Sequence, residues 1–277
     1  MPDWRNRFWA RALLSPSRRE IACQKHEARV LTAAGVVQLW SEASHAGELA
    51  PELVVLRLLG ARGRAELATQ DPANRLASVR SATWTLNPPR FGKSSGPLRV
   101  DHYLAGALAA FDFLSSEHPN ARIWIYGKCI GATAAMHVAA QRKPAALLVK
   151  NIIDVPAVMR ARTNRWLAGS MAARVSASVP DELDARRSAA LAVSPALFVV
   201  SDDDDLAPPQ LQEAVLRAYA GSAHLLRVRG QHDERALSAE DEPRYAAALH
   251  RLWESARLPC VPPEEVAASS NARSTVR

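Results

Sequence analysis

The chain has 277 residues, of which 48% are hydrophobic and 23% are charged, a composition that suits a globular protein with a buried core. No apolar stretch approaches the ~20 residues that a membrane-spanning helix needs, and the first residues lack the apolar run of a secretory signal. The formal net charge is +7, but the basic residues are scattered and no basic stripe alternates with aromatic residues, so we expect no nucleic acid partner.

The first predicted element is a basic and aromatic helical segment within residues 1–27. Its large apolar residues share a helical face surrounded by arginines: Trp4, Phe8, Trp9 and Leu13, with Arg5, Arg7, Arg11, Arg18 and Arg19. Two interpretations stay open. The favoured one packs the aromatic residues on the rest of the protein, and the other lays residues 1–19 on an anionic membrane surface.

From residue 28 onward, predicted strands alternate with predicted helices. Two short strands flank the turn at Ala34-Gly35, as expected for a hairpin at the antiparallel edge of a sheet. Apolar runs and helical spacing predict strands at 28–32, 36–41, 52–59, 81–86, 123–126, 146–152, 196–200 and 224–228, and helices at 66–76, 101–116, 132–141, 209–220 and 243–257. This alternation predicts an α/β fold, in which a mostly parallel eight-stranded sheet has helices on both faces.

The predicted domain organisation has three parts. Residues 1–27 precede one domain at 28–257, and the polar tail at 258–277 is expected to be disordered. Within the domain, residues 154–192 lose the strand period and become rich in arginine and alanine. We expect this insertion to form a small helical cap above the sheet.

The cysteines bear on the cell compartment and on metal binding. Cys23, Cys129 and Cys260 are far apart, without a Cys-x-x-Cys pair or the histidine spacing of a zinc site. We therefore expect neither a disulfide framework nor a metal, and no cofactor motif is present. A reducing cytoplasm fits this pattern best.

The most informative motif lies between the strand at 123–126 and the helix at 132–141. It reads Gly127-Lys128-Cys129-Ile130-Gly131. A side chain raised on a sharp turn from strand to helix requires very small residues two positions before and after it, and the two glycines meet that requirement. The turn also places the sulfur at a helix N-terminus, which stabilises negative charge. A lone cysteine is most often a small buried hydrophobic residue. The residues elsewhere in the chain therefore decide between a catalytic and a structural interpretation of Cys129.

That context supplies a base and an acid. A nucleophile needs a histidine within hydrogen-bond reach and a carboxylate to orient the histidine, both from loops after later strands. The strand at 196–200 runs into a loop with four consecutive aspartates, Asp202, Asp203, Asp204 and Asp205. The strand at 224–228 runs into Gly230-Gln231-His232. The order is nucleophile, acid and base, each at the end of a predicted strand.

Over about residues 28–257, these motifs resemble the α/β-hydrolase superfamily, in particular its single-domain esterases, lipases and monoglyceride-lipase-like enzymes. Residues 87–96 resemble the family's loop after the fourth strand, 126–131 its nucleophile elbow, and 230–232 its Gly-x-His loop. Aligning Pro208 with the proline of the family's acid loop places the acid at Asp204. Asp202, Asp203 and Asp205 remain alternatives, and the glycine-flanked Ser94 and Ser95 match a turn of the family.

The resemblance implies a hydrolase of carboxylic esters or thioesters with a catalytic triad of Cys129, His232 and Asp204. An acyl-enzyme would form on the cysteine, with backbone amides of Ile130 and Ala61 as oxyanion donors. The expected partner is a small-molecule acyl ester or thioester. Two alternatives are an acyltransferase on the same fold, favoured by the cysteine, and a catalytically silent binding or scaffold protein.

The chain departs from the family pattern at two positions. Leu59 stands where the family usually has a histidine before the glycine that corresponds to Gly60. Cys129 stands where the family usually has serine, a replacement that also occurs in its dienelactone-hydrolase-like branch. These departures concern the oxyanion loop and the nucleophile.

Overall fold

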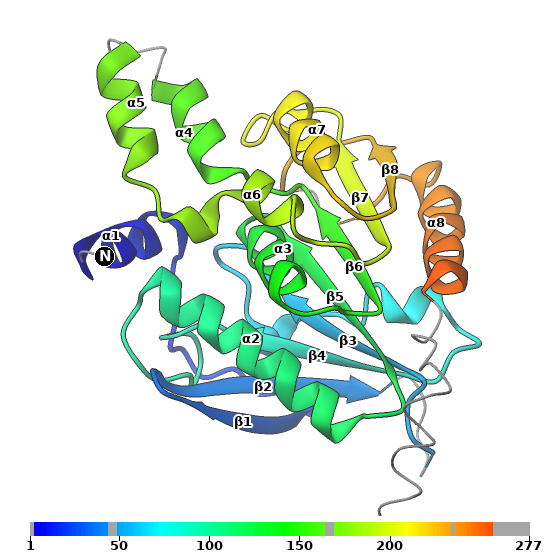
Figure 1. Ribbon diagram of the computed structural model, residues 1–277. Helices are drawn as coiled ribbons and strands as arrows, with labels where there is room; N and C mark the ends of the chain where they lie inside the picture. The colour runs from blue at the N-terminus through cyan, green and yellow to red at the C-terminus, as the bar shows by residue number, and fades with distance from the viewer. Residues whose placement is uncertain (1–2, 44–48, 164–168, 234–235, 257–277) are drawn as a thin grey trace, which may run out of the picture.

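A single eight-stranded sheet forms the centre of the protein in the computed structural model, which describes residues 3–43, 49–163, 169–233 and 236–256 (Figure 1). The strand order is β1-β2-β4-β3-β5-β6-β7-β8. The strands are β1 His26–Thr32, β2 Gly35–Ala43, β3 Leu53–Leu58, β4 Ser81–Asn87, β5 Arg122–Lys128, β6 Ala146–Lys150, β7 Ala196–Ser201 and β8 Ala223–Val228. β1–β2 and β2–β4 are antiparallel, and the other pairs are parallel. The predicted α/β class with a mostly parallel eight-stranded sheet is confirmed.

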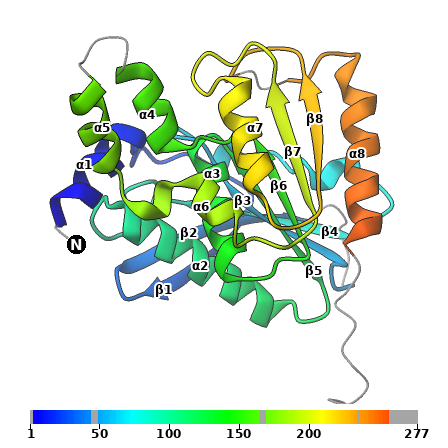
Figure 2. The same ribbon diagram turned by 45° about the horizontal axis from the view of Figure 1, so that its top comes forward.

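Helices cover both faces of the sheet (Figures 1 and 2). They are α1 Asp3–Leu13, α2 Val100–Glu117, α3 Ile130–Gln141, α4 Val155–Thr163, α5 Gly169–Ala177, α6 Ala185–Ala189, α7 Pro209–Ala218 and α8 Asp241–Ser255. The side chains of β5 alternate between the two layers. Ile123 and Ile125 pack in the same cluster as residues of α2 and α3, whereas Trp124 and Tyr126 belong to the cluster that contains α8.

The helix predicted at 66–76 is wrong. The structure has two short 3-10 turns instead, Ala65–Leu67 and Ala73–Arg75. A proline disfavours helical backbone at the residue before it and lacks an amide donor, so the Asp71-Pro72 pair interrupts the helical pattern. The chain between the two turns is held to the sheet, where the Arg57 guanidinium of β3 donates to the backbone oxygen and the hydroxyl of Thr69.

Other predicted elements differ from the structure at their ends. The strand predicted at 146–152 ends at Lys150, because Asn151 adopts a left-handed conformation with φ of 51° that breaks the extended backbone. Between β6 and β7, where a helical cap is predicted, lie α4, α5, the 3-10 turn Asp181–Leu183 and α6. Residues 258–277, predicted to be a disordered tail, and Cys260 lie outside the described residues. None of the described helices is long and apolar enough to cross a bilayer.

Candidate active site

Cys129 lies at the turn between β5 and α3, with φ of 59° and ψ of −128°. Its amide donates to the carbonyl oxygen of Lys150 at 3.0 Å, which ties the turn to β6. A β-carbon at Gly127 would lie 2.3 Å from the carbonyl oxygen of Gly131, and one at Gly131 would lie 2.1 Å from that of Leu58. The two glycines are therefore needed for the close approach of backbone on either side of a strained residue, as the sequence motif predicts.

We expect Gly131→Ala to lower the free energy of unfolding by about 3 kcal/mol, because the new methyl group overlaps rigid backbone. The matched control is Gly169→Ala at the start of α5, where a β-carbon meets nothing within 4 Å. The control is expected to change stability by less than about 1 kcal/mol. Urea unfolding of both variants measures the difference, and equal midpoints would contradict the steric argument.

The four aspartates after β7 occupy different environments. Asp204 is 3% exposed, whereas Asp202, Asp203 and Asp205 are exposed. One carboxylate oxygen of Asp204 accepts from the amides of Leu206 at 3.0 Å and Ala207 at 2.7 Å. The fold therefore buries only one carboxylate of the run, at the position that the resemblance indicates.

His232 and Asp204 form a buried pair. Nδ1 of His232 lies 2.7 Å from Oδ2 of Asp204, which also accepts from the Gln212 amide at 2.9 Å. Burial lowers the pKa of His232, but the bond to Asp204 and the neighbouring Cys129 side chain raise it more, to about 9. Nε2 of His232 is buried and has no hydrogen-bond partner among the described residues, although the Cys129 side chain is near enough to raise the pKa of His232.

The two predicted oxyanion donors are the amides of Ile130, at the start of α3, and Ala61, in the loop after β3. The amide of Ile130 is the first of α3, where backbone amides have no partner within the helix. Gly60 lies against the cysteine, since a methyl group on it would be 3.3 Å from Cβ and 3.9 Å from Sγ of Cys129. The next amide, that of Ala61, takes part in none of the backbone hydrogen bonds of the described residues.

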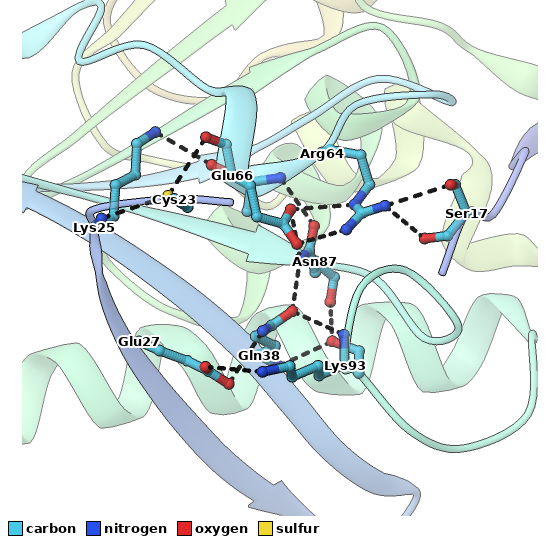
Figure 3. A network of polar contacts seen from close by, with 11 residues as sticks. Ser17, Cys23, Lys25, Glu27, Gln38, Arg64, Glu66, Asn87 and Lys93 are labelled. Atoms are coloured by element: carbon cyan, nitrogen blue, oxygen red, sulfur yellow. Dashed lines mark hydrogen bonds and ion pairs between the residues drawn. The ribbon is translucent and has the colours of Figure 1, made fainter. Parts of the chain in front are cut away.

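A polar network holds the loop after β3, although this loop lacks the family's histidine (Figure 3). The Arg64 guanidinium pairs with Glu66 at 2.6 Å and donates to the carbonyl of Ser17 at 2.9 Å. The Asn87 amide at the end of β4 donates to Glu66 at 3.1 Å and to Gln38 of β2 at 2.8 Å. Burial raises the pKa of Glu66, but the bonds from Arg64 and Asn87 lower it more, so its carboxylate stays charged. The loop is thus tied to two strands and to the N-terminal segment.

Two residues beside this site carry no signal in the sequence motifs. Asn151 donates to the hydroxyl of Ser201 at 3.0 Å and to the carbonyl of His232 at 3.1 Å, and its own oxygen accepts from the Ser201 amide at 2.9 Å. It therefore links the ends of β6 and β7 to the histidine loop. Tyr103 in the first turn of α2 is buried, and its hydroxyl has no partner among the described residues. Burial and the neighbouring Cys129 raise the pKa of this phenol well above its usual value.

The rival nucleophiles have structural roles. The Ser94 hydroxyl donates to the carbonyl of Asn87 at 2.7 Å and accepts from the amide of Gln38 at 2.9 Å. The Ser95 hydroxyl accepts from the amide of Val36 at 2.8 Å. Both serines thus fasten the loop after β4 to β2. The part of the chain that the structure describes contains no group of three His, Cys, Asp or Glu side chains arranged to hold a metal.

Similar structures are known, although no protein-family model and no curated protein matches the sequence. An esterase of Pyrococcus furiosus has a TM-score of 0.65 at 14% identity, over 87% of this chain and 97% of its own. Est1E from Butyrivibrio proteoclasticus, with ferulic acid bound, has a TM-score of 0.62 at 16% identity, over 82% of this chain and 98% of its own. A serine hydrolase without a lid from Xanthomonas campestris has a TM-score of 0.54 at 15% identity, over 88% of this chain and 100% of its own. The sheet order, the elbow and these neighbours identify the architecture of this chain as the α/β-hydrolase fold.

Proposed function

We propose that this protein hydrolyses carboxylic esters or thioesters through an acyl-enzyme on Cys129. The observation that carries the proposal is the buried His232–Asp204 bond of 2.7 Å beside a cysteine on a strained turn. The similarity to esterases adds support at the level of the fold. Three residues distant in the sequence thus combine a nucleophile, a base and an orienting carboxylate.

In the first half of the reaction, the thiol proton moves to Nε2 of His232, and Sγ of Cys129 attacks the acyl carbonyl carbon. The new oxyanion accepts hydrogen bonds from the amides of Ile130 and Ala61. The tetrahedral intermediate collapses as the bond to the leaving group breaks. The leaving alcohol or thiol takes the proton from His232, and the acyl group remains on the cysteine as a thioester.

In the second half, His232 accepts a proton from water, whose oxygen attacks the thioester carbon. Collapse of the second intermediate breaks the carbon–sulfur bond, releases the carboxylic acid and returns the proton to the thiolate. Asp204 stabilises the imidazolium in both halves through Nδ1. A thioester also passes its acyl group to alcohols and amines, so acyl transfer is the second candidate, favoured by the cysteine itself.

The proposal predicts a covalent intermediate that mass spectrometry detects. We expect p-nitrophenyl esters of short and long acyl groups, or acyl thioesters, to add one acyl group to the protein in a rapid quench. Peptide mapping should place that group on Cys129. The matched control is Cys23→Ala, since Cys23 is the other free thiol of the described chain and is half-buried.

The outcomes separate the candidates. Labelling at Cys129 that disappears with time in water supports hydrolysis, and faster loss on adding an alcohol or amine, with a new acylated product, identifies acyl transfer. Labelling only at Cys23, or no labelling and no turnover over the whole series, contradicts the proposal and favours the silent binding protein.

A further inference from the structure

Helix α1 has two faces of different character. Successive residues of a helix lie ~100° apart, so Trp4, Arg7, Phe8 and Arg11 share one face. All four are exposed, and Trp4 and Phe8 are 57% and 55% exposed. Residues of the opposite face are buried: Asn6, Trp9 and Ala10. We call the first set the aromatic–basic face.

The buried face is fastened to the end of α5. The Arg5 guanidinium donates to the carbonyl oxygens of Ala177, Ser178 and Val179, each at 2.7 Å. The indole nitrogen of Trp9 donates to the Ser178 carbonyl at 2.9 Å. These bonds satisfy carbonyls at a helix C-terminus and set the rotation of α1 about its own axis. The aromatic–basic face is therefore presented outward by a folded scaffold, and α1 lies beside α5 in both views (Figures 1 and 2).

The chemistry of this face matches an anionic lipid surface. Tryptophan and phenylalanine insert at the boundary between headgroups and acyl chains, and arginines beside them attract anionic headgroups. Exposed Arg18 and Arg19 follow the helix, and the chain has a formal net charge of +7. We propose that the aromatic–basic face of α1 docks this protein on membranes that contain anionic phospholipids.

The position of α1 gives such docking a consequence for the candidate active site. The amide of Ser15, directly after Leu14 at the end of this segment, donates to the carbonyl of Ala61 at 2.9 Å. Ala61 supplies the second amide proposed for the oxyanion, so α1 is joined to the loop beside Cys129. Docking through α1 would hold the loop after β3 close to the lipid surface.

Vesicle sedimentation of the full chain tests the proposal. We expect binding to phosphatidylcholine vesicles that contain phosphatidylglycerol, and about tenfold weaker binding to phosphatidylcholine alone. The double variant Trp4→Ser/Phe8→Ser should weaken binding to the anionic vesicles by about tenfold or more, because it removes the inserting side chains. Arg11→Glu/Arg18→Glu should have a similar effect, and raising the salt concentration should weaken binding of the unchanged chain.

The matched control is Leu31→Ser/Leu67→Ser, which removes two exposed apolar side chains outside α1. It should bind like the unchanged chain, and equal urea midpoints verify that the variants fold. Absent binding to anionic vesicles, equal binding by all variants, or binding that ignores the anionic lipid would overturn the proposal. So would a concentration-dependent dimer that the aromatic variant abolishes, since the face would then join two copies. The readout needs no turnover, so it is independent of the proposed hydrolysis.

Discussion

Cys129→Ala is expected to lower kcat/KM for ester hydrolysis at least about a thousandfold, because the acyl-enzyme has no nucleophile on which to form. Cys129→Ser is expected to retain less than about a tenth of the activity at neutral pH. A serine hydroxyl is a far weaker acid than a thiol, so it depends on His232 to remove its proton during the attack, whereas a thiol can attack as a thiolate. Initial rates on a p-nitrophenyl ester provide the measurement.

The control for this pair is Cys23→Ala, which should keep full activity because Cys23 precedes β1 and its thiol bonds to the backbone of Glu66. Unchanged turnover in Cys129→Ala would remove the basis of the proposed mechanism. Higher activity in Cys129→Ser would instead identify a serine-hydrolase site weakened by its cysteine.

Asp204→Asn should lower kcat/KM about a thousandfold or more while leaving the side chain's shape intact. The amide keeps the volume of the carboxylate but loses the charge that stabilises the imidazolium, and it can present a donor to Nδ1 of His232. The matched controls are Asp203→Asn and Asp205→Asn, among the same four consecutive aspartates. Because these side chains are exposed, both variants should keep kcat/KM within about twofold of the unchanged chain. A large loss in either control, with Asp204→Asn active, would move the acid to another position.

The same variant changes the pH dependence of stability. Since the pKa of His232 is raised from 6.5 to about 9, its protonation stabilises the folded state fully below pH 6.5, and this contribution is lost as the pH rises through about 9. Asp204→Asn removes one cause of the raised pKa. The free energy of unfolding should therefore fall less between pH 6.5 and 9 in the variant than in the unchanged chain, as urea titrations at several pH values would show.

Much of the sheet could be predicted from the sequence, because the pattern of buried residues that defines each strand lies within the strand itself. Runs such as Leu53–Leu58, which is apolar except for Arg57, are buried on both faces, which is the pattern of a central parallel strand. The elbow could also be predicted, since the crowding around Gly127 and Gly131 involves backbone within a few residues and the adjacent strand. The helix predicted at 66–76 failed because its apolar spacing ignored the Asp71-Pro72 break and the sheet arginine that holds Thr69.

The residues that position the candidate site were beyond pattern analysis. Asn151 bonds to a serine 50 positions away and to the backbone of His232, and nothing in its neighbourhood in the sequence indicates either partner. The network around Glu66 likewise joins segments that meet only in the fold. The sequence shows that the loop after β3 lacks the family's histidine, but it does not show that Arg64, Glu66 and Asn87 hold this loop instead.

The sequence by itself determined the α/β class, the turn that raises Cys129, and the order along the chain of the candidate nucleophile, acid and base, because strand period, helix spacing and turn sterics act between near neighbours. Only the tertiary structure decided which of four aspartates is buried against His232, and which aromatic residues of α1 face inward. Burial and pairing are properties of segments that come together on folding: Asp204 meets His232 from another loop, and Trp9 meets the carbonyl of Ser178 across the molecule.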